Sequence, residues 1–204
     1  MLEVKVIDDK KEIAQSETFF MDHFQWKNVY KPKAYGKMAL LKDRGLYIEL
    51  VSEESDPVRT IDQDELHICN DSVMEVFIAF KKDDTPLTND DLYLNFEMNA
   101  RGKLYAKYGF GRKNRKFITK EELKESECQA TIEAEKWSLK VLIPKSLLER
   151  LGQWDHIMAG KIFYCNFYKM SENPEIEHYA SYQEIASETP NFHLPIYFGE
   201  ARRI

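Results

Sequence analysis

The chain is a succession of short strand-like runs separated by turns, with almost no segment of helical periodicity. In the clearest pair, residues 36–41 and 46–51 are apolar and are joined by Lys42-Asp43-Arg44-Gly45, a linker that predicts a hairpin. A second pair, residues 129–134 and 137–143, has its turn at Glu135-Lys136. Many short strands with regular turns predict an all-β sandwich, in which two antiparallel sheets pack face to face.

The length of 204 residues fits a single domain, residues 1–204, and a hydrophobic content of 43% is enough for a core. One or two short helices are expected beside the strands. Residues 146–151 predict one, which ends at Gly152, and the charged residues 120–129 form either a second short helix or a loop.

Charge and hydropathy argue against several classes of partner. The net charge of −6 does not favour a nucleic acid or an anionic membrane, and the basic residues 112–116 are interpreted as a solvated hairpin tip. No apolar run reaches membrane-spanning length. Three cysteines without CxxC spacing and a start without a signal peptide predict free thiols and a cytoplasmic location.

The strand at residues 93–99 carries polar side chains with a period of two. Alternation places Tyr93, Asn95, Glu97 and Asn99 on one face, and Leu94, Phe96 and Met98 on the other. Asparagine is uncommon in strands, and its amide both donates and accepts hydrogen bonds. The polar face is therefore a platform for a hydroxyl-rich ligand or an ordinary solvent-facing side of a sheet.

Other polar residues lie within apolar strands. Glu75 is one, and because a buried carboxylate is costly unless it is paired, it indicates a cleft, an edge or a salt bridge. Glu75 and Glu97 could face each other on neighbouring strands, as a glycosidase would require, although acidic pairs are frequent in sheets. Asn166 and Tyr168 share one face of a later strand.

Four segments in order resemble the family 9 carbohydrate-binding modules, over roughly residues 20–200. They are residues 71–77, 93–102 and 137–144, and the aromatic-rich C-terminal run at 166–199. The resemblance implies a jelly-roll-like sandwich and a non-catalytic function, the binding of a short oligosaccharide or a chain end in polysaccharide breakdown. A structural or protein-interaction sandwich that has lost the sugar slot is the alternative, and a glycosidase is a third.

The resemblance also implies site residues. Glu75, Asn95, Asn166 and Lys169 would hydrogen-bond the sugar, and Tyr182 would be the stacking platform, with Tyr179 as a lesser candidate. Residues 178–182 are expected to form a loop over the sheet. Family members hold the sugar between two tryptophans. Here one position carries Tyr182 and the other, at Ile68-Cys69-Asn70, carries no aromatic residue. Weak saccharide binding is therefore expected, with Trp26, Trp137 and Trp154 in core or loop packing.

No catalytic residue, cofactor or metal site is predicted. The five histidines are scattered without HxH or HExxH spacing. Structural calcium is conceivable at the acidic turn formed by Asp83, Asp84 and residues 89–91, since carboxylates and amides are its preferred ligands, but such turns are more often solvated. The oligomeric state stays open.

Overall fold

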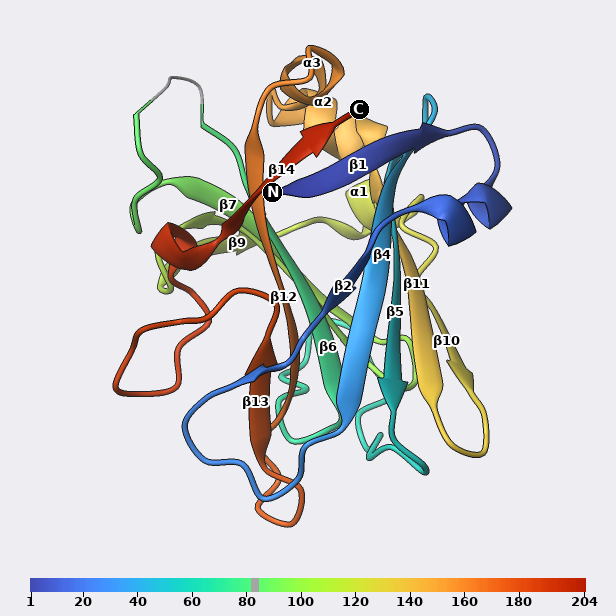
Figure 1. The fold of residues 1–204 in the computed structure, drawn as a ribbon, viewed down its shortest axis with the longest axis vertical. Helices are drawn as coiled ribbons and strands as arrows, with labels where there is room; N and C mark the ends of the chain where they lie inside the picture. The colour runs from blue at the N-terminus through green and yellow to red at the C-terminus, as the bar shows by residue number, and fades with distance from the viewer. Residues whose placement is uncertain (82–84) are drawn as a thin grey trace.

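The computed structural model describes residues 1–81 and 85–204, which form two packed β-sheets (Figure 1). Sheet A has the strand order β9-β8-β7-β6-β12-β14, and β13 pairs with β12 and β3 with β13. Its strands are β3 (His23–Phe24), β6 (Val73–Ala79), β7 (Leu92–Asn99), β8 (Leu104–Phe110), β9 (Asn114–Phe117), β12 (Phe163–Ser171), β13 (His178–Ser181) and β14 (Gly199–Arg203).

Sheet B has the order β10-β11-β5-β4, with β2 paired to β4. Its strands are β2 (Thr18–Phe20), β4 (Lys33–Leu41), β5 (Gly45–Glu53), β10 (Gln129–Ile132) and β11 (Trp137–Pro144). The two hairpins expected from the sequence are β4–β5 and β10–β11. The turn between β4 and β5 uses positive φ at Asp43 and at Gly45, which explains the glycine there.

Strand β1 (Leu2–Ile7) connects the two sheets. Its first half runs parallel to β14 and its second half parallel to β4. The two ends of the chain therefore lie side by side (Figure 1). The predicted β-sandwich is confirmed, and within the described residues the strands depart from antiparallel pairing in these two parallel contacts.

The helices are short. They are α1 (Lys120–Leu123), α2 (Lys145–Arg150), α3 (Trp154–Met158) and the 3-10 turns η1 (Lys10–Gln15) and η2 (Pro195–Tyr197). A capping box between Thr119 and Glu122 starts α1. The third α-helix was not expected, because five residues carry little periodic signal. None of the helices in the described residues is long and apolar enough to span a membrane.

The main core lies between the sheets. From β7, Leu94, Phe96 and Met98 point into it, as the period of two predicted. Phe19 of β2 stacks on Phe167 of β12 with ring centroids 3.8 Å apart, which joins the two sheets directly. Full burial of such a side chain is worth about 1.5–3 kcal/mol.

A second apolar layer covers the outer face of sheet A, the face turned away from sheet B. Side chains such as Phe77, Tyr168 and Tyr179 rise from its strands and are covered by Ile185 and Phe192 from the loops. Loops rather than solvent therefore cover much of this face. The polar residues that alternate with the core on β6 and β7 lie under these loops.

One sequence expectation is wrong, and another lies partly outside the described residues. Residues 178–181 were expected in a loop but form β13, because they pair in register with β12. In the expected calcium turn, Asp83 and Asp84 lie outside the described residues. Asp91 accepts a hydrogen bond from the Thr88 backbone at 2.7 Å and forms an ion pair with Lys81 at 3.0 Å.

Candidate functional site

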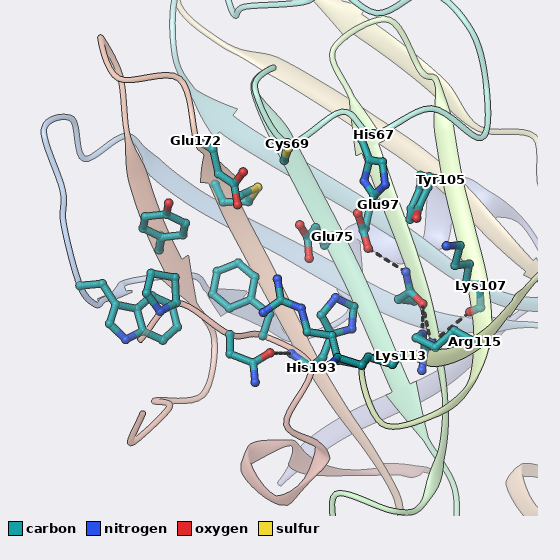
Figure 2. Close-up of a pocket in the computed structure, with 18 residues that line it drawn as sticks. His67, Cys69, Glu75, Glu97, Tyr105, Lys107, Lys113, Arg115, Glu172 and His193 are labelled. Atoms are coloured by element: carbon teal, nitrogen blue, oxygen red, sulfur yellow. Dashed lines mark hydrogen bonds between the residues drawn. The ribbon is translucent and has the colours of Figure 1, made fainter. Parts of the chain in front are cut away.

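A cavity of about 300 Å³ opens on the outer face of sheet A, and we call it the sheet A cavity. Its floor comes from β6, β7, β8 and β12, and its walls come from loops and from β13. In Figure 2, Glu75 and Glu97 lie next to each other in the middle, and His67 and Tyr105 lie to one side. Pockets of about 300–1,000 Å³ are typical of small-ligand sites.

The strand register explains why these floor residues meet. Glu75 of β6 is paired with Glu97 of β7, and Glu97 in turn with Tyr105 of β8. On the other side, Glu75 is paired with Tyr168 of β12. Because neighbouring strands lie about 4.8 Å apart, these four side chains form one row across the outer face of sheet A, and Glu75, Glu97 and Tyr105 of this row line the cavity. The facing of Glu75 and Glu97 that the sequence suggested is confirmed.

Aromatic rings border this row on two sides. At the β12 end, Phe192 stacks on Tyr168 with centroids 4.0 Å apart, and Trp26 lies 5.6 Å from Tyr179 and 5.7 Å from Phe192. The indole N–H of Trp26 donates to the Ser187 carbonyl at 2.7 Å, which fixes the ring.

Across the floor, the ring of Tyr105 packs 5.1 Å from that of His67 and 5.2 Å from that of Phe117. The cavity therefore has aromatic residues on both sides. Positions 68–70 carry no aromatic residue, as the sequence shows, but Tyr105, from a strand distant in sequence, lines the cavity on this side. Trp26, expected in packing alone, lines the cavity.

The two floor carboxyl groups differ in their surroundings. Glu75 is 4% exposed, and within residues 1–81 and 85–204 its side chain forms no hydrogen bond. Burial, together with the nearby charges of Glu97 and Glu172, raises the pKa of Glu75 well above its usual value. This shift favours the protonated form of Glu75, in which its carboxyl group can both donate and accept hydrogen bonds.

The buried charge of Glu97 is better compensated than that of Glu75. Burial raises the pKa of Glu97 to about 7, against the opposing effects of a hydrogen bond from Asn95 and the charge of Arg115. The Asn95 amide donates to Glu97 Oε1 at 2.8 Å. The floor thus holds two neighbouring carboxyl groups with raised pKa values, and that of Glu97 lies near neutrality.

Arg115 of β9 is built into the same network. Its Nε donates to Asn95 Oδ1 at 3.0 Å, and its guanidinium carbon lies 3.6 Å from the centroid of the Tyr93 ring. Further donation to the Tyr93 carbonyl, at 3.1 Å, holds the side chain in place. Burial lowers the pKa of Arg115 to about 10, so it remains charged.

The solvated-tip interpretation of residues 112–116 therefore holds for the exposed Arg112, Lys113 and Lys116 but is wrong for Arg115. The hairpin brings Arg115 inward because β9 packs tightly on β8. A Cβ at Gly109, where φ is +150°, would lie 2.2 Å from the Asn114 carbonyl oxygen, so only glycine fits there.

Of the six residues proposed from sequence, Glu75, Asn95 and Tyr179 line the cavity. Asn166 lies on the same sheet face but is covered: its amide donates to the Gln183 carbonyl at 3.1 Å and accepts from the Gln183 backbone at 2.9 Å. It anchors the loop after β13. Lys169 points to the opposite face of β12, into the main core, where its Nζ lies 3.3 Å from Glu54 Oε2.

Tyr182 is also placed away from the cavity. It follows β13, and the alternation along that strand turns it to the side opposite Tyr179. Its ring lies 5.5 Å from that of Phe19 and 5.9 Å from that of Phe167, against the main core. Its backbone N–H donates to the Phe167 carbonyl at 2.9 Å.

We expect Tyr182→Ala to lower the free energy of unfolding by about 2 kcal/mol, because it removes a half-buried ring from the core. Saccharide affinity should stay unchanged. Urea denaturation and ligand titration check both expectations. The control is Phe20→Ala, since Phe20 is 45% exposed. Native stability with lost binding would instead restore the stacking role expected from the sequence.

The sequence did not single out Tyr105, Lys107, Trp26 or Phe192. Extending the period of two from Leu104 would have put Tyr105 and Lys107 on the face of Asn95 and Glu97, once β7 and β8 were taken as neighbours. Trp26 and Phe192 lie outside strands, where no periodicity points to them. Their places depend on the packing of loops against β12 and β13.

Residues 5–202 match the sequence profile of carbohydrate-binding family 9. The chain belongs to this family. No curated protein sequence matches it. Among solved structures, one of a candidate carbohydrate-binding protein from Bacteroides uniformis is 24% identical, with a TM-score of 0.82, and the match covers 100% of this chain and 98% of that one.

A family 9 module from Caldicellulosiruptor kristjanssonii is similar in two complexes. The cellotriose complex is 13% identical with a TM-score of 0.64, covering 99% of this chain and 92% of that one. The glucose complex is 12% identical with a TM-score of 0.63, covering 99% and 95%. At these identities the likeness shows the fold, and it agrees with the family 9 resemblance seen in the sequence.

Proposed function

We propose that this family 9 domain binds a short saccharide or a chain end, without catalysis, in the sheet A cavity. The observation that carries the proposal is a polar floor of carboxyl and amide groups between aromatic residues on two sides. The apolar C–H face of a sugar ring packs on flat aromatic rings, and its hydroxyls need paired donors and acceptors. The cavity offers both.

The floor supplies complementary hydrogen-bonding groups. In its protonated form, which burial favours, the Glu75 carboxyl group donates and accepts, whereas an ionised Glu97 accepts only. Asn95 and Arg115 are already hydrogen-bonded to each other, so they hold Glu97 in position. The cellotriose and glucose complexes of the Caldicellulosiruptor module support a saccharide as the ligand class.

The position of the carboxylates favours binding over hydrolysis. Glycosidases place two carboxyl groups on either side of the scissile bond. Glu75 and Glu97 are instead neighbours on one face of one sheet, so both would approach a ligand from the same side. A protein-interaction sandwich without a sugar slot is less supported, since the slot has aromatic residues on both sides.

We expect Tyr105→Leu and Trp26→Leu each to weaken saccharide binding at least about tenfold, because leucine keeps the apolar bulk and loses the flat ring. The measurement is NMR shift mapping or calorimetry with glucose, cellotriose and xylotriose, where wild-type dissociation constants of roughly 0.1–10 mM are expected. Phe20→Ala is the control. If none of these sugars shifts signals around the cavity, the protein-interaction alternative replaces this proposal.

A further inference from the structure

The charge of the sheet A cavity differs from that of the whole chain. The chain has a net charge of −6, yet the cavity is lined by four cationic residues, Lys107, Arg112, Lys113 and Arg115. Three acidic residues line it, Glu75, Glu97 and Glu172. Even with all three acids ionised, four positive charges face three negative ones. The cavity is thus positive inside an acidic protein.

The charges are also separated along the cavity. Glu172 and Cys69 lie toward one end, and Lys107, Lys113, Arg115 and His193 lie toward the other (Figure 2). The cations at this end also affect His193. Burial, and then the charges of Arg115, Arg112 and Lys107, lower the pKa of His193 to about 3. His193 is therefore neutral, and its Nδ1 lies 2.8 Å from the Tyr93 hydroxyl.

In the described residues none of the four cations forms an ion pair, although acidic residues outnumber basic ones in the chain by 35 to 29. Arg115 is held instead by hydrogen bonds to Asn95 and to backbone carbonyls. The Lys107 ammonium lies 4.6 Å from the Tyr105 ring centroid and 4.3 Å from that of Phe117. These rings hold it at the cavity without neutralising it.

We propose that the saccharide bound in this cavity is anionic, with its carboxylate or sulfate group at the end formed by Lys107, Arg112 and Lys113. This inference rests on the proposed function and names the class of sugar. The aromatic residues and the floor would take the sugar ring. Lys107, Arg112 and Lys113 would bind the negative group. A neutral sugar would leave these cations without an ion-pair partner.

The test compares sugars that differ in one group. Cellobiose, the disaccharide with glucuronic acid in place of its non-reducing glucose, and cellobiose 6-sulfate are titrated into the full chain by calorimetry at 50 mM and 500 mM salt. We expect at least one anionic sugar to bind about tenfold more tightly than cellobiose at low salt. High salt should reduce the difference, because it screens charges near the surface. The stronger of the two identifies the group as carboxylate or sulfate.

Variants of the basic residues test which of them cause the preference for an anionic sugar. Lys107→Met and the double variant Arg112→Gln/Lys113→Gln should each remove most of the preference, measured as the ratio of the affinities for the anionic sugar and for cellobiose. Lys116→Met removes the same charge from the same hairpin outside the cavity, and it should keep the preference. Binding of cellobiose with no gain for either anionic sugar would overturn this inference alone. Absence of binding by all three sugars would overturn the proposed function as well.

Discussion

Lys169→Met is expected to lower the free energy of unfolding by about 3–5 kcal/mol, because it leaves a buried carboxylate without its counter-charge. Lys169 is 0% exposed, and its Nζ lies 3.3 Å from Glu54 Oε2 and 2.8 Å from His178 Nε2. Although burial acts to raise the pKa of Glu54, the charge of Lys169 and the hydrogen bonds to Glu54 outweigh it and lower that pKa. Glu54 thus remains ionised between the sheets.

Glu54 has two further hydrogen-bond partners. Its carboxylate accepts hydrogen bonds from the Trp137 indole at 2.8 Å and the Ser72 hydroxyl at 2.7 Å. These two neutral donors remain in the variant, but they cannot balance a full charge. The network links β12, β11 and the segments before β6, so its loss should loosen the contact between the two sheets.

Urea denaturation at pH 7 measures the effect, with Lys140→Met as the control. Lys140 lies 3.5 Å from Glu49 in an exposed pair, so its loss should cost less than about 1 kcal/mol. The double variant Lys169→Met/Glu54→Gln should regain part of the lost stability, since no buried charge is left unpaired. A Lys169→Met protein of native stability that no longer binds saccharide would return Lys169 to the binding site.

Strand interiors were predictable from the sequence because a period of two assigns side chains to faces. That rule predicted Leu94, Phe96 and Met98 on the core face and Asn95 and Glu97 on the other face, where the structure has them. The same rule misled at β12 only because Lys169, one residue after Tyr168, belongs to the opposite face. A lysine in a core is rare unless it is paired, and its partner Glu54 lies outside any strand.

The walls of the site were harder to predict. Tyr179 and Tyr182 were both expected in one loop, whereas the pairing of β13 with β12 puts them on opposite faces. Trp26 reaches the cavity through contacts with Tyr179 and Phe192, which are more than 150 residues away in sequence. Such contacts arise from tertiary packing, which local patterns do not encode.

We expect Glu75→Gln to raise the free energy of unfolding by about 2–4 kcal/mol at pH 8, because it removes the cost of placing an acidic group in a buried, unpaired position. The folded pKa of Glu75 lies above its unfolded value, so the folded state holds a proton that the unfolded state releases. Stability from this group is present at low pH and is lost as pH rises from about 4.5 through the folded pKa. Glutamine does not ionise, so the variant should show a flatter dependence.

Denaturation of both proteins at pH 5, 6.5 and 8 gives the test, with Glu133→Gln, an exposed acid, as the control. The difference between wild type and Glu75→Gln should be small at pH 5 and should grow with pH, whereas a constant or reversed difference would contradict the argument. The amide also reproduces the donor and acceptor of a neutral carboxyl group. Saccharide binding should therefore persist in Glu75→Gln and fall in Glu75→Leu. The two variants thus separate the contribution of Glu75 to ligand binding from its cost to the stability of the fold.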